Sequence, residues 1–291
     1  MKRALLSAAC LALAACGGVH HAVRSELPQP ATIAVLPFAG SADVGTREAT
    51  RSLLNSRLAA RGYRTAELPW IDRVMSERGW LRDPAKFTTT KLPIDDVVTA
   101  LGVDAIVVGD DFDESSFNVL VLRRHSFGGA LALQTKRGAY WSATHSAGAY
   151  GGFALTSGQV FSELRAQGEH GTPMMTLALI DELVDDVVET VPARKNVAPV
   201  EPEPVVANVA TKREAAPDGG TRLVVESTAP PGCTLWLDVL PTSRGIPMVA
   251  LPNTNGRYRG THDLPTNDTA ASIVIRARTP FGRETRTEVK P

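Results

Sequence analysis

Residues 31–38, with the sequence ATIAVLPF, decide the fold of the first half of the chain. They form a short apolar run with β-branched residues and a proline near its end, which predicts a buried strand. A second run of this kind, residues 104–109 (DAIVVG), predicts another buried strand. The chain between them contains apolar residues at helical spacing, so the first half is expected to begin as an α/β unit.

Three helices are expected between these two strands. The first begins at Thr46 and ends at Gly62, the second covers residues 71–78, and the third runs from Pro93 to about Gly102. The inner side of the first helix consists of Leu53, Leu54 and Leu58. Its arginines are expected to be mostly solvated: Arg47, Arg51 and Arg57.

An antiparallel meander is expected after the second buried strand. Its strands cover residues 117–122, 130–134 and 140–145, with turns at Gly128-Gly129 and at residues 136–138. The glycine-rich residues 148–158 are expected to form a loop.

A strong amphipathic helix is expected from Thr172 to Val191. Its apolar face is expected to contain Leu177, Ile180, Leu183, Val184, Val187, Val188 and Val191. Its other face is acidic and is expected to be solvated rather than a specific partner surface: Asp181, Glu182, Asp185, Asp186 and Glu189.

The last part of the chain has a different composition. Residues 192–217 are rich in Pro, Val, Ala and Glu and lack periodicity, which predicts an extended linker. Short strand-like runs follow at residues 222–227, 234–239, 247–251, 257–262, 271–278 and 284–289. Such spacing favours a small β-sandwich of the immunoglobulin or fibronectin kind, with Trp236 as its expected core residue.

The first residues carry the pattern of a secretory signal peptide. Lys2 and Arg3 precede an apolar run over residues 4–15, which is shorter than the roughly 20 residues of a membrane-spanning helix. The stretch Leu13-Ala14-Ala15-Cys16 resembles the lipobox of bacterial lipoproteins. This resemblance implies that residues 1–15 are removed and that Cys16 carries acyl chains that hold the protein to a membrane. By the same resemblance, Gly17 points to the outer membrane.

The expected organisation therefore has five parts. They are a signal peptide over residues 1–15, a tether over 16–30, an α/β domain over 31–191, a linker over 192–217 and a β-sandwich over 218–291. In fold class this is an α/β (α+β) domain, with a mixed sheet flanked by helices, followed by an all-β domain.

Charge and cysteine content limit the classes of partner. The chain of 291 residues has 31 Lys and Arg against 31 Asp and Glu, without a basic stripe, so nucleic acid is not an expected partner. Cys10 leaves with the signal peptide, which leaves Cys233 as the only unmodified thiol of the mature chain. It is expected to be a small buried side chain, with a reactive thiol as the alternative.

The sequence contains no familiar catalytic or metal-binding motif, so no catalytic, cofactor-binding or metal-ligating residues are predicted. The best site-like cluster is residues 110–114, DDFDE, directly after a buried strand. Asp111 and Asp113 have the opening spacing of a calcium loop, but Leu122 stands where that loop needs glutamate. A solvated acidic turn is therefore expected. Three histidines are expected to be separate surface residues: His125, His145 and His170.

Three segments together resemble the TolB amino-terminal-like superfamily of envelope proteins. They are residues 33–38 (IAVLPF), residues 101–109 (LGVDAIVVG) and Tyr140-Trp141. The resemblance covers about residues 31–191 and is nearest to a subgroup of periplasmic lipoproteins without an assigned role, with CsgG and PelC more distant. It implies a mixed sheet flanked by helices and a role in envelope assembly or transport. The turn at residues 133–138, LQTKRG, departs from the Asp-Ala-x-Thr-Gly-Glu pattern of these relatives.

The leading hypothesis is a non-enzymatic, lipid-anchored outer-membrane lipoprotein that faces the periplasm. It would act as an accessory or scaffold, with envelope proteins or further copies of itself as partners. A CsgG-like secretion-pore subunit is the second hypothesis, and the short apolar run at residues 117–122 counts against it, because a membrane-crossing strand needs roughly 9–11 residues. A sugar-binding or ligand-binding protein, or an enzyme, is the third.

Overall fold

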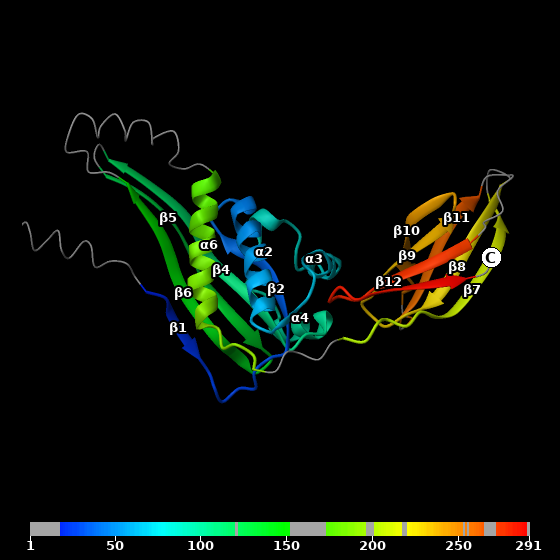
Figure 1. The fold of residues 1–291 in the computed structure, drawn as a ribbon, viewed down its shortest axis with the longest axis horizontal. Helices are drawn as coiled ribbons and strands as arrows, with labels where there is room; N and C mark the ends of the chain where they lie inside the picture. Colours follow the sequence, from blue (N-terminus) through cyan, green and yellow to red (C-terminus); the bar gives the residue numbers. More distant parts are fainter. Residues whose placement is uncertain are drawn as a thin grey trace, which may run out of the picture. The chain divides into compact units, whose positions relative to one another are not determined.

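The computed structural model describes residues 18–119, 122–151, 173–195, 201–216, 220–252, 254, 256–264 and 272–289. The chain divides into two compact units, Met1–Ala198 and Pro199–Pro291. Figure 1 shows helices and a long sheet in the first unit and strands alone in the second.

A six-stranded mixed sheet forms the centre of the first unit, with the order β1-β6-β5-β4-β2-β3. Strand β2 pairs in parallel with β3 and β4, while β4, β5, β6 and β1 pair antiparallel. The strands are β1 (His20–Val23), β2 (Thr32–Gly40), β3 (Arg64–Thr65), β4 (Ala105–Val119), β5 (Leu122–Thr135) and β6 (Gly138–Gly151). The mixed sheet predicted from the sequence is thus present.

Helices pack on this sheet through apolar side chains. They are α2 (Val44–Ala60), α3 (Leu68–Glu77), the 3₁₀ turn η1 (Pro84–Lys86), α4 (Ile94–Leu101) and α6 (Pro173–Thr190). Leu54 of α2 and Val184 of α6 share one core cluster with Val35 of β2. Because successive strand residues point to opposite faces, the fully buried Leu36 faces the other side, where α3 packs against β2 with the fully buried Ile71.

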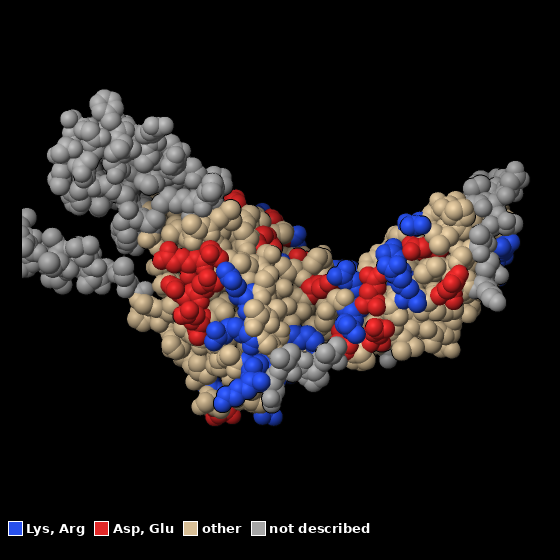
Figure 2. All heavy atoms as spheres, viewed as in Figure 1, with Lys and Arg blue, Asp and Glu red and all other residues tan. Residues whose placement is uncertain are grey.

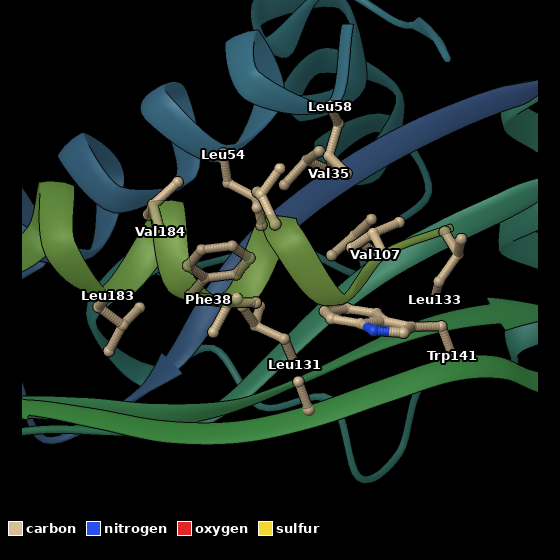
Figure 3. Packing of buried hydrophobic residues seen from close by; sticks show 14 of the residues in the cluster. Val35, Phe38, Leu54, Leu58, Val107, Leu131, Leu133, Trp141, Leu183 and Val184 are labelled. Carbon is tan, nitrogen blue, oxygen red and sulfur yellow. The ribbon is translucent and has the colours of Figure 1, made fainter. Parts of the chain in front are cut away.

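The core under α2 and α6 is aromatic at its centre (Figure 3). Phe38 and Phe112 stack with ring centroids 4.7 Å apart, and Phe127 lies 5.6 Å from Phe112. Trp141 is 2% exposed, and its indole nitrogen donates a hydrogen bond of 3.0 Å to Thr190 of α6. Burial of such rings provides much of the stabilisation of a small domain.

The strands of the meander are longer than the sequence indicated. Strand β4 has 15 residues and contains residues 105–109 of the first apolar run as well as residues 117–119, so the expected acidic turn at residues 110–114 is wrong. Gly128 and Gly129 lie inside β5 rather than in a turn. The ring of Phe112 occupies the space that a side chain at Gly129 would need, which accounts for a glycine at this strand position. The turn at residues 136–137 is confirmed. Because residues 117–119 belong to a strand of 15 residues, strand length no longer counts against the secretion-pore hypothesis.

Two stretches predicted to be irregular contain strands. Residues 20–23 of the expected tether form β1, which pairs with β6, and residues 207–215 of the expected linker form β7 (Ala207–Ala215). All residues of β1 and nearly all of β7 are exposed. An edge strand without a buried face has no apolar alternation, so its sequence carries no strand signal. The glycine-rich loop prediction is wrong for residues 148–151, which belong to β6, and its remainder lies outside the described residues.

Helix α6 was predicted correctly in position, but its buried face is rotated slightly. Leu177 is 54% exposed, whereas Leu179 is buried. Asp181 and Asp185 on the acidic face both pair with Arg57 of α2, at 3.0 and 2.9 Å. Figure 2 shows this arrangement, with acidic residues along α6 beside basic ones. Part of the face expected to be only solvated therefore joins the two helices.

Two arginines of α2 are buried, contrary to the prediction that they are solvated. Arg51 is fully buried, and its Nε donates to the carbonyl oxygen of Val35 at 2.9 Å while its Nη2 contacts Asp72 of α3 at 2.7 Å. Arg47 is 3% exposed and donates from Nη1 to the carbonyl oxygen of Phe38 at 2.6 Å. The side chains lie on the buried side of the helix because carbonyl groups of β2 accept their hydrogen bonds.

The second unit is an antiparallel seven-stranded sheet with the order β13-β12-β9-β10-β11-β8-β7. Its remaining strands are β8 (Thr221–Thr228), β9 (Thr234–Leu240), β10 (Ser243–Ala250), β11 (Arg257–Leu264), β12 (Ser272–Arg278) and β13 (Glu284–Val289). The all-β prediction is confirmed. In place of two separate sheets, one sheet curls so that residues such as Val225, Leu237 and Ile275 form a single core.

Trp236 does not belong to the core of the second unit. It is only partly buried and lies between the buried residues Leu235 and Leu237 of β9, so it points to the outer face. There the guanidinium of Arg276 lies 5.7 Å from the indole ring and also pairs with Asp238. The prediction failed because aromatic character alone does not tell which face of a strand is buried.

Replacing Arg51 tests the importance of the buried guanidinium. We expect Arg51→Leu to lower the free energy of unfolding of the first unit by about 2–3 kcal/mol, because hydrogen bonds from a charged group to Val35 and Asp72 are lost. Arg57→Leu removes a pair whose side chains are about half exposed and should cost under about 1 kcal/mol. Urea unfolding followed by circular dichroism checks this, and equal costs would contradict it.

Replacing Gly109 tests the aromatic stack. A Cβ at this position would lie 2.4 Å from the ring of Phe38 and 2.7 Å from that of Phe112. We expect Gly109→Ala to cost about 1–3 kcal/mol of stability, because the packed rings have to shift. Gly18→Ala meets no atom within 4 Å and is the control. Thermal unfolding measures both variants.

Candidate functional site

A groove of roughly 550 Å³ lies on the sheet of the first unit, beside the start of β1. It is open on the face opposite α6, where small residues alternate along β5, at Ser126, Gly128 and Ala130, and small polar residues alternate along β6, at Thr144 and Ser146. Its lining consists of Gly18, His20, Asp111, Asp113, Ser126, Gly128, Gly129, Ala130, Thr144, His145 and Ser146. The groove can therefore offer hydroxyl, imidazole and carboxylate groups to a polar ligand.

A bulge in β4 shapes the edge of this groove. The register of β4 on β5 shifts between Asp110 and Asp113, and Asp111 has a φ of 54°. Gly40 of β2 approaches so closely that a Cβ there would lie 2.1 Å from the carbonyl oxygen of Phe112. The same oxygen accepts a hydrogen bond of 2.9 Å from the amide of Ala42. The bulge turns Phe112 into the core and leaves its acidic neighbours at the surface.

The four carboxylates of residues 110–114 do not converge. Asp110 accepts a hydrogen bond from Thr89, and Asp113 accepts one of 2.6 Å from Ser41. Glu114 faces α6, where it accepts a hydrogen bond of 3.2 Å from Thr176. Within the described residues, no three His, Cys, Asp or Glu side chains gather as a metal site would require. Asp110, Asp113 and Glu114 instead connect neighbouring segments of the fold, and Asp111 lines the groove.

His125 and His145 are buried under α6, contrary to the prediction of surface histidines. His125 Nε2 lies 3.2 Å from Glu114 Oε1, and His145 Nε2 lies 2.9 Å from Asp186 Oδ2. His125 pairs in register with Ala149 and His145 with Gly129, so the two imidazoles are separated along the strands. His170 lies outside the described residues. His145 therefore links β6 to α6, whereas His125 pairs within the sheet with Glu114 of β4, and the two histidines do not form one cluster.

The groove itself was not predicted from the sequence. Its small residues give no apolar alternation, and the only signal was the spacing by two of Ser142, Thr144 and Ser146 in β6. Cys16, the predicted acylation site, lies outside the described residues, and Gly18 at the start of the described chain lines the groove.

Comparisons with known proteins give structural likenesses only. No protein-family model matches the chain, and no curated protein matches it. Among solved structures, lipoprotein GNA1162 from Neisseria meningitidis is 17% identical, covers 48% of this chain and 96% of its own, and has a TM-score of 0.36. A PelC dodecamer from Paraburkholderia phytofirmans is 12% identical, covers 59% and 96%, and has a TM-score of 0.35.

A third likeness is the hypothetical protein CT253 from Chlamydia trachomatis. It is 16% identical, covers 57% of this chain and 100% of its own, and has a TM-score of 0.28. These likenesses do not establish a family. Within the described residues, none of the helices combines the length and the apolar character needed to cross a bilayer.

The buried thiol of Cys233 is expected to be unreactive. Cys233 is 4% exposed, and burial, with a smaller contribution from the charge of Glu201, raises the pKa of its thiol to about 11. The nucleophilic thiolate is therefore scarce at pH 9. We expect a disulfide reagent at pH 9 to leave Cys233 unmodified in the folded protein and to modify it in urea, as peptide mass spectrometry would show. Rapid modification of the folded protein would contradict this.

Proposed function

We propose that this protein is a bacterial envelope lipoprotein, held to the outer membrane by acyl chains on Cys16 and facing the periplasm. It acts as an accessory or scaffold in envelope assembly or export, through contacts rather than catalysis. The observation that carries the proposal is the order of residues 1–16, in which two cations and an apolar run precede Leu13-Ala14-Ala15-Cys16.

The arrangement of the first unit supports a role as a scaffold. The chain leaves this unit at the end of the sheet where β2 begins: Arg194 donates to the carbonyl oxygen of Pro30, and Tyr63 donates to that of Pro192 at 2.7 Å. Gly18 lies near Ser146, toward the other end of the sheet. Gly18, two residues after the proposed anchor, and the exit toward the second unit are thus at different ends of one packed body.

The polar groups that the sequence singled out serve to hold this body together. Asp113 binds Ser41, Glu114 binds Thr176 and His145 binds Asp186, so each connects two elements of the fold. Because these side chains make structural contacts, they support a protein that acts through binding at its exposed surface rather than through catalysis. Envelope proteins or further copies of the chain are the partners we propose.

Acylation of Cys16 is the first test. We expect mass spectrometry of the native protein to find a chain that begins at Cys16 and carries a diacylglycerol, and we expect density-gradient fractionation to place it in the outer membrane. Cys16→Ser should abolish the modification and release the protein from the membrane. Cys10→Ser, within the signal peptide, is the matched control and should change neither. An unmodified thiol at Cys16, with residues 1–15 still attached, would contradict the proposal.

A secretion-pore subunit is the second candidate function, and strand length favours it. Strands β4, β5 and β6 have 15, 14 and 14 residues, more than the roughly 9–11 that a membrane-crossing strand needs. Electron microscopy of the detergent-extracted protein separates the two candidates. A ring with a central channel embedded in the detergent belt indicates the pore, whereas a monomer or small oligomer that copurifies with envelope proteins indicates the accessory.

A further inference from the structure

The second unit has an unpaired strand edge, which belongs to β13. Among the strands that the structure describes, β13 pairs with β12 alone and ends the sheet order. Just before this strand, the amide of Thr279 donates to the carbonyl oxygen of Arg283 at 2.8 Å, which makes these two residues a hydrogen-bonded pair. Hydrogen-bonded and non-hydrogen-bonded pairs alternate along an antiparallel ladder. The backbone groups that face away from β12 are therefore those of Glu284, Arg286 and Glu288.

The side chains along this edge alternate in charge. Glu284, Arg286 and Glu288 are exposed, whereas Thr285 and Thr287 between them are partly buried. Two copies of β13 can pair antiparallel about a two-fold axis where the outward backbone groups of one copy meet those of the other. An axis near the middle of the strand then passes through position 285, 286 or 287.

Charge distinguishes these three registers. An axis at 286 places Arg286 opposite its own copy and Glu284 opposite Glu288. An axis at 285 or 287 places Arg286 opposite a glutamate of the other copy, and opposite charges directly across a ladder stabilise it, whereas like charges destabilise it. The segment that enters the second unit contacts Arg283 through Glu203 at 3.5 Å, so the strand end near residue 285 already has a neighbour. The register centred on Thr287 is the one that remains.

The opposite edge of the sheet, β7, does not support such pairing. The amide of Ala216 donates to the carbonyl oxygen of Gly220 at 2.9 Å, so by the same alternation the outward backbone groups belong to residues 211, 213 and 215. An axis at 212, 213 or 214 then places a charged residue opposite its own copy: Lys212, Arg213 or Glu214. Each of these registers brings like charges together, which protects an exposed edge from association.

We propose that β13 pairs with β13 of a second copy of the chain, antiparallel and centred on Thr287, so that the sheet continues from one copy into the other. Arg286 of each copy then lies opposite Glu288 of the other, and each of these pairs exchanges two backbone hydrogen bonds. The proposal goes beyond the proposed function by assigning the surface through which copies meet, and it does not depend on acylation of Cys16. One edge of six residues is a small interface, so the association is reversible and increases with protein concentration.

A disulfide across the axis tests the register. Thr287→Cys and Thr285→Cys are made separately in the full-length protein that also carries Cys233→Ser, and each protein is purified in detergent. The Cα atoms of a non-hydrogen-bonded pair lie about 4.5 Å apart, within the range of a disulfide, whereas the two copies of residue 285 would be separated by about 13 Å along the strand. We expect mild oxidation to link Thr287→Cys into a dimer and to leave Thr285→Cys monomeric.

Peptide mass spectrometry identifies the linked residues, and the parent protein with Cys233→Ser alone reports any link through Cys16. A dimer formed by Thr285→Cys, or by both variants equally, would contradict the register centred on Thr287. If neither variant is linked at any protein concentration, the pairing itself is overturned. Mass spectrometry of the same samples reads the acylation of Cys16 separately, so failure of the pairing is distinguishable from failure of the lipid anchor.

Two complementary charge variants provide a readout that a general loss of structure would not give. Arg286→Glu places two glutamates opposite each other, and Glu288→Arg places two arginines opposite each other. Each variant alone should therefore associate about tenfold more weakly than the parent protein, or weaker still, in sedimentation velocity. An equimolar mixture of the two should recover the association of the parent, because the mixed pair again has opposite charges at both positions.

Circular dichroism checks that both charge variants are folded. A mixture that remains monomeric would contradict the proposed pairing. Association of Glu288→Arg alone at the level of the parent would contradict the register, because an axis at 285 leaves that residue without a charged neighbour across the ladder.

Discussion

The packing of the first unit depends on how the backbone carbonyl groups of β2 near Pro37 are hydrogen-bonded. Proline has no amide hydrogen, and the pairing of β2 with β4 is irregular between Val35 and Phe38. A buried carbonyl oxygen without a hydrogen-bond partner is costly. Arg51 and Arg47 of α2 donate to the carbonyl oxygens of Val35 and Phe38. A strand interrupted by proline thus requires a helix with two buried arginines, and this requirement fixes α2 on the sheet.

The same constraint explains which parts of the fold could be predicted. Residues 32–38 and 105–109 are buried on both faces, so their apolar runs identify them as central strands without any knowledge of the neighbours. Arg47 and Arg51 are polar residues whose partners are backbone carbonyls 9 and 16 residues away, and no local pattern shows that. Strands β1 and β7 at the sheet edges have no buried face and were missed for that reason.

The candidate site was less predictable than the fold, again for a physical reason. Adjacent residues in a strand point to opposite faces, and the bulge at Asp111 changes this alternation locally. The run at 110–114 looked like one acidic cluster, yet Asp113 faces the groove and Glu114 faces α6. The prediction of a lipid anchor differs, because it rests on a linear motif at Cys16 and not on the fold.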